Sequence, residues 1–387
     1  MRILWLNWKD IKHPEAGGAE VYTHEIAKRL VKKGHEVILI SSRYPNASSR
    51  EELDGVEIIR LGNIKYVYIH ALYYYTKYLK CNVDVVVEEI NGNIAWLTPL
   101  YAKEPVVVLR HQVEYTGSKN FYRSVLPYKL PRLIAMALYF NEAFYLKLYA
   151  KLKVPFITVS NSAKQDLVNA GIPPHMIYIV PNGLSYRPLE RIPEKDEEFT
   201  AVFVGRLTPT KNPEHAIKAF VIYRKLGGKG RLVIIGRGEL LHELRQLYGR
   251  PCIIFTGYLS EEEKRKWLSR AHVLLVPSIR EGWGQVVIEA NAHGTPAIGY
   301  NVPGLRDSIK HLDTGILVPY GDIRAMVKAL LALYEDITLW KRLARNCLNW
   351  ARMFSWDTSA DKFEKILLKM DSLFDIGMSN HEKKCIR

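Results

Sequence analysis

The sequence predicts an α/β protein with two doubly wound parallel sheets, and three observations support this prediction. The chain has 387 residues, which is more than one hydrophobic core usually serves. In both halves, short apolar runs typical of strands alternate with segments of helical periodicity. A stretch rich in Pro, Glu and Arg separates the two alternating series, so we expect two α/β domains joined by a linker.

The domain boundaries follow from this division. We expect a first domain over residues 1–184, a linker over 185–198 and a second domain over 199–354. A last helix is predicted at about residues 357–375, and the polar, basic tail 376–387 is expected to be loose.

The elements of the first domain are predicted from periodicity and from turn residues. After the first strand, Gly17 and Gly18 lie in a loop before a segment with helical spacing, which Gly34 ends. This order of strand, glycine loop, helix and strand is what a doubly wound parallel sheet requires. The predicted strands are 3–8, 37–40, 56–61, 83–87, 106–109, 156–159 and 176–180, and the predicted helices are 19–33, 120–153 and 162–169.

The second domain repeats the alternation. Ser355 and Asp357 are candidate N-caps of the last helix, because short polar side chains accept hydrogen bonds from free backbone N–H groups. The predicted strands are 201–204, 232–235, 253–255 and 273–276, and helices are expected from Glu214, after Gly284, over 322–345 and over 358–373.

Composition limits the partners and the compartment. The net charge of +15 indicates an anionic partner without specifying which one. The scattered cysteines Cys81, Cys252, Cys347 and Cys385 are typical of a reduced compartment and argue against structural zinc. The N-terminus lacks the apolar core of a signal peptide, and no apolar run approaches the ~20 residues that a membrane span needs. We therefore expect a cytoplasmic protein.

The most informative stretch begins at Glu281, with the sequence EGWGQVVIEANAHGTPAI. It follows the apolar run 273–276, and helical spacing begins after Gly284, so we expect a strand, a glycine-rich loop and a helix. The free N–H groups and the positive dipole end of such a helix favour a bound anion. Glu281 and Glu289, eight residues apart, border the anion site. The arrangement suits a ligand that has both phosphate and hydroxyl groups.

The E-x7-E spacing of this stretch resembles the motif of the family 4 retaining glycosyltransferases, which have the GT-B fold. The resemblance extends from about Trp5 to the last helix and includes phosphatidylinositol-mannosyltransferase-like members of glycosyl transferases group 1. It implies two Rossmann-like domains facing a cleft, of which the first binds the acceptor and the second the nucleotide-sugar donor. It also implies a C-terminal helix that crosses back to the first domain.

A second loop, from Gly205 to Lys211, matches the GRL…K pattern of this family. Arg offers a forked set of donors and Lys a mobile charge, which together can neutralise a diphosphate. The resemblance implies that Arg206 and Lys211 stabilise the leaving diphosphate and that Glu281 holds sugar hydroxyls. His111, at the end of a predicted strand, would hydrogen-bond the sugar or orient the acceptor.

The other donor contacts are implied in the same way. At Gly17 and Gly18, close approach of the donor phosphate to the backbone would leave no room for a Cβ atom, and Glu289 would hold the ribose. Tyr258 would either stack on the base or pack against the protein. The implied donor-binding residues are Gly17, Gly18, Gly205, Gly236, Gly238, Tyr258, Gly282, Trp283, Gly284, Gln285 and Glu289.

We expect the reaction to need no metal and no other cofactor, because the sequence contains no Asp-x-Asp pair. The expected function is retaining transfer of a hexose from a UDP- or GDP-sugar to a glycan or lipid-linked acceptor at the cytoplasmic membrane face. Whether retention arises by front-face attack or through a short-lived ion pair stays open.

A membrane surface is the second anionic partner that the sequence suggests. Residues 115–153 are basic and aromatic, with Glu142 as the single acid, and such stretches can lie in the interface of an anionic membrane. The alternative is core packing with a solvated basic rim. Residues 65–80, rich in Tyr and Lys and without an acid, also favour a lipid-linked acceptor and a peripheral position on the inner face of the membrane.

Two other functions compete with glycosyl transfer. A GT-B nucleotide-sugar epimerase would turn over donor without an acceptor. A basic membrane- or nucleic-acid-binding protein would account for the charge, but the sequence has no helix-turn-helix, RNA-recognition or zinc pattern, so no nucleic-acid partner is expected.

Overall fold

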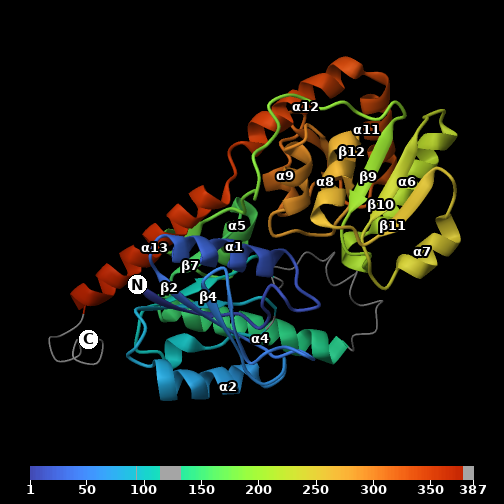
Figure 1. Ribbon diagram of the computed structural model, residues 1–387. Coiled ribbons are helices and arrows are strands. Elements are labelled where there is room, and N and C mark those ends of the chain that lie inside the picture. The colour runs from blue at the N-terminus through green and yellow to red at the C-terminus, as the bar shows by residue number, and fades with distance from the viewer. Residues whose placement is uncertain (93, 114–131, 378–387) are drawn as a thin grey trace. The chain divides into compact units, whose positions relative to one another are not determined.

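The computed structural model of the chain describes residues 1–92, 94–113 and 132–377 (Figure 1). The tail 378–387 and the segment 114–131, which holds much of the predicted membrane-binding stretch, lie outside the described residues. The described chain divides into two compact units. Unit 1 comprises residues 1–183 and 356–377 as far as they are described, and unit 2 comprises residues 184–355.

Unit 1 is organised around a mostly parallel sheet. Within the described residues its strand order is β3-β4-β2-β1-β5-β6-β7-β8, and only β3 runs antiparallel to its neighbour. The strand β3 was not predicted, because its sequence REEL lacks an apolar run. The strands are β1 (Arg2–Leu6), β2 (Glu36–Ser41), β3 (Arg50–Leu53), β4 (Val56–Arg60), β5 (Val85–Glu89), β6 (Val106–Leu109), β7 (Phe156–Thr158) and β8 (Ile177–Ile179).

The helices of unit 1 join these strands in the predicted alternation. In the tyrosine-rich segment 65–80, neither α2 nor the π-helical turn η1 that continues it was predicted. The helices are α1 (Gly18–Lys32), α2 (Val67–Tyr74), η1 (Tyr75–Leu79), the 3₁₀ turn η2 (Thr98–Leu100), α4 (Arg132–Lys151), α5 (Asn161–Asn169), the 3₁₀ turn η4 (Pro174–Met176) and α13 (Trp356–Gly377).

The last helix, α13, belongs to unit 1 and packs beside α1 (Figure 1). Phe363 stacks on Trp5 of β1 with 5.1 Å between ring centroids, and the Ser359 hydroxyl donates to the Pro181 carbonyl at 2.7 Å. Asp357 was predicted as a candidate N-cap, but the helix begins one residue earlier. Its carboxylate instead accepts from Arg29 Nε on α1 at 2.6 Å, so it ties the two helices together.

Unit 2 has an entirely parallel sheet with the strand order β11-β10-β9-β12-β13-β14 within the described residues. Numbered from β9 as the first strand, this is the 3-2-1-4-5-6 order of the Rossmann fold. The last two strands, β13 and β14, were not predicted. The strands are β9 (Thr200–Val204), β10 (Arg231–Ile235), β11 (Ile253–Gly257), β12 (Val273–Val276), β13 (Ala297–Tyr300) and β14 (Gly315–Val318).

The helices of unit 2 differ from the prediction in two ways. Those over Leu241–Tyr248, Glu261–Arg270 and Leu305–Ser308 were not predicted. The single helical region predicted over 322–345 is two helices, because Asp336 ends α11 and its carboxylate caps α12 by accepting from Leu339 N at 2.8 Å. The helices are the 3₁₀ turn η5 (Pro209–Lys211), α6 (Pro213–Lys225), α7 (Leu241–Tyr248), α8 (Glu261–Arg270), α9 (Gln285–Asn291), α10 (Leu305–Ser308), α11 (Ile323–Glu335) and α12 (Ile337–Ala351). In the described part of the chain, no helix combines the length and the apolarity that crossing a bilayer requires.

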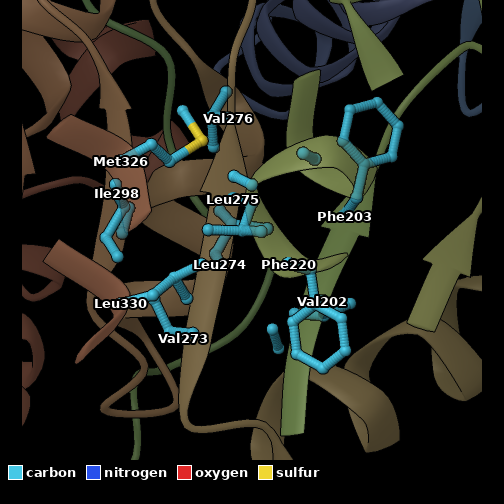
Figure 2. Close-up of a cluster of buried hydrophobic side chains, with 14 of the residues drawn as sticks. Val202, Phe203, Phe220, Val273, Leu274, Leu275, Val276, Ile298, Met326 and Leu330 are labelled. Atoms are coloured by element: carbon cyan, nitrogen blue, oxygen red, sulfur yellow. The ribbon is translucent and has the colours of Figure 1, made fainter. Parts of the chain in front are cut away.

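The core of unit 2 lies on the central strands β9 and β12 (Figure 2). Val202 and Phe203 of β9 and Leu274 of β12 are buried there beside Phe220 of α6 and Leu330 of α11. Burying such side chains contributes about 1.5–3 kcal/mol each before entropy is counted. The rigid pair of strands fixes where the loops at their carboxyl ends begin.

Candidate active site

The predicted site loops of unit 2 follow the two strands at which the sheet changes direction. The chain leaves β9 toward β10 on one side and leaves β12 toward β13 on the other. In open α/β sheets, ligands bind outside the carboxyl ends of the strands at this point. The loop 205–212 follows β9 and the loop 277–284 follows β12, so the fold brings the two predicted loops together.

Three contacts join these loops. Lys211 Nζ lies 2.5 Å from Glu281 Oε1, the Asn212 side-chain amide donates to the Pro277 carbonyl at 3.1 Å, and Ile279 N donates to the Thr210 carbonyl at 3.0 Å. Both charged residues were predicted from the sequence, but their pairing was not. Because all three contacts cross the switch point, the two loops form one structural element.

Arg206 differs from Lys211 in its surroundings. Its side chain is exposed, and it forms no ion pair with any residue that the structure describes. Its guanidinium therefore remains available for a bound anion, whereas Lys211 must share its charge with Glu281.

Gly284 ends the second loop and has a backbone conformation that favours glycine. Its φ of +86° lies in the left-handed region, and a Cβ atom would sit 2.8 Å from the Ser308 hydroxyl oxygen. Helix α9 begins at the next residue, Gln285. The protein itself therefore requires this glycine, apart from any ligand.

Trp283 and Gly282 complete this loop. Gly282 is half-buried, and Trp283 is only 7% exposed, with its ring edge-on to Phe354 at 5.0 Å. Within the described residues, the buried indole N–H of Trp283 has no hydrogen-bond acceptor. An unsatisfied buried donor costs about 1–3 kcal/mol, so a ligand or water that accepted from it would be favoured.

Glu289, the second acid of the motif, has a lysine partner that sequence analysis missed. Lys264 Nζ on α8 lies 2.9 Å from Glu289 Oε2, and the Gln285 side chain also hydrogen-bonds Glu289. Burial raises the pKa of Glu289, while Lys264 acts in the opposite direction. Although burial opposes the charge of Lys264, Glu289 and Glu261 raise its pKa. The sequence signal for α8 was the capping box formed by Ser260 and Glu263, just ahead of Lys264.

The remaining predicted donor contacts of unit 2 lie after β9, β10 and β11. Gly205 follows β9 and Gly236 follows β10. A Cβ atom on Gly236 would lie 1.9 Å from the carbonyl oxygen of Gly205, so a glycine at position 236 allows the loops after β9 and β10 to approach closely. Gly238 lies two residues further on. Tyr258 follows β11 and is 69% exposed, with the Arg237 guanidinium 5.2 Å from its ring centroid. Tyr258 therefore lies outside the core, and it either stacks on the base or packs against the protein, as with Arg237.

In unit 1, Gly17 and Gly18 lie at the beginning of α1, after β1. Glu20 caps this turn by accepting from Gly17 N at 2.6 Å and also accepts from the Asn91 amide at 2.8 Å. A Cβ atom on Gly18 would meet nothing within 4 Å. Unlike Gly284, this glycine is not required by the packing of the protein itself.

His111 follows β6 and contacts a carboxylate that sequence analysis did not single out. Its Nε2 lies 3.1 Å from Glu89 Oε1, at the end of β5. The ring of Tyr22 approaches the imidazole edge-on at 5.0 Å. A signal was present in the sequence, because two adjacent glutamates end an otherwise apolar strand.

The predicted site residues thus fall into two sets, one in each unit. Gly17, Gly18 and His111 belong to unit 1, and the others belong to unit 2. Among the described residues, no three His, Cys, Asp or Glu side chains are grouped so that they could hold a metal ion.

Solved structures identify the fold. Sucrose-phosphate synthase from Thermosynechococcus elongatus superposes with a TM-score of 0.76 at 19% identity, over 96% of this chain and 99% of that one. An Anabaena protein solved in complex with UDP-glucose superposes with a TM-score of 0.69 at 16% identity, over 95% of this chain and 100% of that one. The fold is therefore GT-B, as predicted.

Sequence comparisons then identify the family. The model for glycosyltransferase family 4 matches residues 16–186, and the model for glycosyl transferases group 1 matches residues 189–350. An uncharacterized glycosyltransferase of Methanocaldococcus jannaschii is 26% identical over 82% of this chain and 85% of its own length. The chain belongs to glycosyltransferase family 4 and is a transferase, so the epimerase and the non-catalytic binding protein are not favoured.

Proposed function

We propose that the chain transfers a hexose from a UDP- or GDP-sugar, with retention of configuration at the anomeric carbon and without a metal ion. The Lys211–Glu281 pair at the switch point of unit 2 is the main support. UDP has further support from the Anabaena neighbour, whose structure was solved with UDP-glucose.

The residues of unit 2 have distinct roles in this proposal. When the bond between the anomeric carbon and the diphosphate breaks, negative charge grows on the diphosphate oxygens. Arg206 and Lys211 stabilise that charge, and preorganised cations are effective because they need no reorganisation during the reaction. Glu281 accepts hydrogen bonds from sugar hydroxyls, and Glu289 accepts them from the ribose.

A thermal-shift panel of UDP- and GDP-sugars, each with and without excess chelator, tests the donor site. We expect one nucleotide class to raise the melting temperature, equally with and without chelator. Glu281→Ala should abolish the shift. Glu262→Ala is the matched control, because Glu262 also pairs with a lysine, Lys266, but on the exposed face of α8. Activity that is lost on chelation and restored by Mg²⁺ or Mn²⁺ would contradict the metal-free proposal.

Retention is tested on the product itself. The proposal expects the anomeric proton of the transferred sugar to show the same configuration by NMR as in the donor. An inverted product would contradict it.

We further propose that the acceptor is lipid-linked and that unit 1 reaches it at an anionic membrane surface. Tyr66, which precedes α2, and Ile69 and Tyr73 on α2 are 55%, 66% and 59% exposed and repeat at the spacing of one helical face. A helix that is apolar on its exposed side as well as its buried side needs a further partner. Lys65, Lys77 and Lys80 add positive charge to this surface.

Sedimentation with vesicles tests this part separately from catalysis. Vesicles with anionic lipid should bind the protein at moderate salt, whereas neutral vesicles should not. A variant with Tyr66→Ser, Ile69→Ser and Tyr73→Ser should lose binding but keep the thermal shift with donor. Equal sedimentation of variant and wild type would show that another surface binds the membrane, and no sedimentation of either would count against a membrane acceptor.

A further inference from the structure

Glu89 is a buried carboxylate at the centre of a hydrogen-bond cluster in unit 1. It ends β5, is fully buried, and lies on the strand that neighbours β1 at the switch point of this sheet. Its Oε2 accepts from the indole N–H of Trp5 at 2.9 Å and from the hydroxyl of Thr23. Its Oε1 faces His111 Nε2 at 3.1 Å. A carboxylate with three partners in a buried site is held in one orientation.

The cluster also fixes the ring of His111. Tyr22 approaches the imidazole edge-on, with 85° between the ring planes, and its own hydroxyl is anchored on the Val180 carbonyl at 3.1 Å. The His111 side chain remains 13% exposed. Within the described residues, its Nδ1 has no hydrogen-bond partner. Nε2 of the ring therefore hydrogen-bonds the protein, whereas Nδ1 does not hydrogen-bond any described residue.

From this geometry we propose that Glu89 is a positioning residue that sets the tautomer of His111. A carboxylate can only accept, so Nε2 carries the proton and Nδ1 of the neutral ring presents a lone pair. His111 then acts as a hydrogen-bond acceptor for a hydroxyl group of the sugar donor or of the acceptor. This inference rests on the proposed glycosyl transfer, because that reaction supplies the hydroxyl-bearing substrate.

Glu89→Gln reverses the tautomer without removing volume. Trp5 can only donate, so the amide oxygen of the substituted side chain must take the place of Oε2. The amide NH₂ group then faces His111 and needs an acceptor there. The ring can supply one only if Nε2 is bare, which moves the proton to Nδ1. The variant thus keeps the fold and turns the outer nitrogen of His111 from an acceptor into a donor.

The tautomer is measured directly by ¹⁵N NMR of histidine-labelled protein at about pH 8, where an ordinary imidazole is neutral. The His111 signals are identified by their loss in His111→Gln. In wild type we expect a protonated Nε2 and a bare Nδ1, and in Glu89→Gln the opposite assignment. A bare Nε2 in wild type, or the same tautomer in both proteins, would overturn the proposal. The wild-type spectrum alone tests the assigned tautomer of His111, even if the variant does not fold.

Kinetics separate positioning from a general structural effect. With donor consumption as the assay, Glu89→Gln should lower kcat at least about tenfold, as expected for loss of a well-placed hydrogen bond, and leave the KM for donor within about twofold. Glu88→Gln is the matched control. Glu88 is equally buried on the same strand but contacts Trp96, Thr98 and Tyr149 instead of His111.

The outcomes distinguish this inference from the proposed function. We expect Glu88→Gln to lower thermal stability while retaining the wild-type His111 tautomer. A reversed tautomer in Glu89→Gln with unchanged kcat would show that His111 does not act through Nδ1. If wild type consumes no nucleotide sugar at all, the proposed function fails, whereas the NMR comparison still tests the Glu89–His111 pair.

Discussion

Lys211 and Glu281 are 70 positions apart in the sequence, yet their charged atoms lie 2.5 Å apart across the switch point of unit 2. The pair joins the loops after β9 and β12 and is mostly buried. Each charge neutralises the other in the free enzyme. In the proposed reaction, a bound donor would replace this single contact by two, since its diphosphate would attract Lys211 and its sugar hydroxyls would attract Glu281.

Neutralising either partner should therefore impair transfer. We expect Lys211→Met and Glu281→Gln each to lower kcat/KM about 10²- to 10³-fold, the range found when one group that stabilises developing negative charge is removed. The double variant should lose less than the product of the two single losses, because the residues act as a pair. Lys218→Met and Glu214→Gln are controls in an exposed pair on α6. Activity of Lys211→Met within about threefold of wild type would mean that the site lies elsewhere.

The Lys264–Glu289 pair makes donor affinity depend on pH in a testable way. Burial already raises the pKa of Glu289, and removing Lys264 would raise it further. Lys264→Met should therefore leave more of Glu289 protonated than in wild type at the same pH and raise the KM for donor about tenfold. Affinity should recover as pH rises and the carboxyl ionises. Lys266→Met, at an exposed position on the same helix, should change neither KM nor its pH dependence.

Two glycines should respond differently to alanine. Gly18 has open space around its missing Cβ and is the first residue of α1, so Gly18→Ala should keep the thermal stability of wild type. It should nevertheless weaken activity strongly if the donor approaches this backbone. Gly284→Ala is strained by the positive φ and by Ser308, so it should lower the melting temperature as well. Full activity in Gly18→Ala would remove Gly18 from the site.

Protonation of His272 should lower the stability of the protein in mild acid. Burial, with repulsion from Lys195, lowers the pKa of His272 to about 4, and its Nδ1 accepts from Thr200 N at 3.1 Å. Because the ring has a pKa of about 6.5 in the unfolded chain, stability should fall as pH decreases from about 6.5 to 4, by at most about 3 kcal/mol.

His272→Asn tests this, because its side-chain oxygen accepts from Thr200 but does not titrate. The difference in the chemical unfolding midpoint between pH 7.5 and pH 4.5 should shrink in this variant. His311→Asn is the control, since His311 also accepts from a backbone N–H, that of Leu317 at 3.0 Å, but is exposed. An equal pH response in wild type and His272→Asn would contradict the assignment.

Much of the fold was predictable because its strands are apolar and its helices periodic. The strand β12, the glycine loop and α9 are local in sequence, so their order could be inferred directly. Strand β3 was missed because an edge strand with the sequence REEL has no apolar run. The break between α11 and α12 was missed because helical periodicity continues across Asp336, although its carboxylate caps the second helix.

The partners of the site residues were harder to infer than the residues themselves. Glu289 and Lys264 lie on different helices, and only the packing of α8 against α9 brings them together. The same holds for His111, which follows β6, and for Glu89, which ends the neighbouring strand β5. A motif predicts which groups face a ligand, whereas the groups behind them depend on tertiary contacts that no local pattern contains.

The helix α13 has a consequence for recombination between relatives. Unit 1 is assembled from two separate segments of the chain, because Phe363 and Ser359 complete the packing around Trp5 and Pro181. A chimera that exchanges only the first 183 residues would join a foreign β1 and α1 to the native α13. Exchange of a whole unit 1 between family members therefore requires two crossovers, one near Gly183 and one near Trp356, so that α13 is inherited with the strands and helices it packs against.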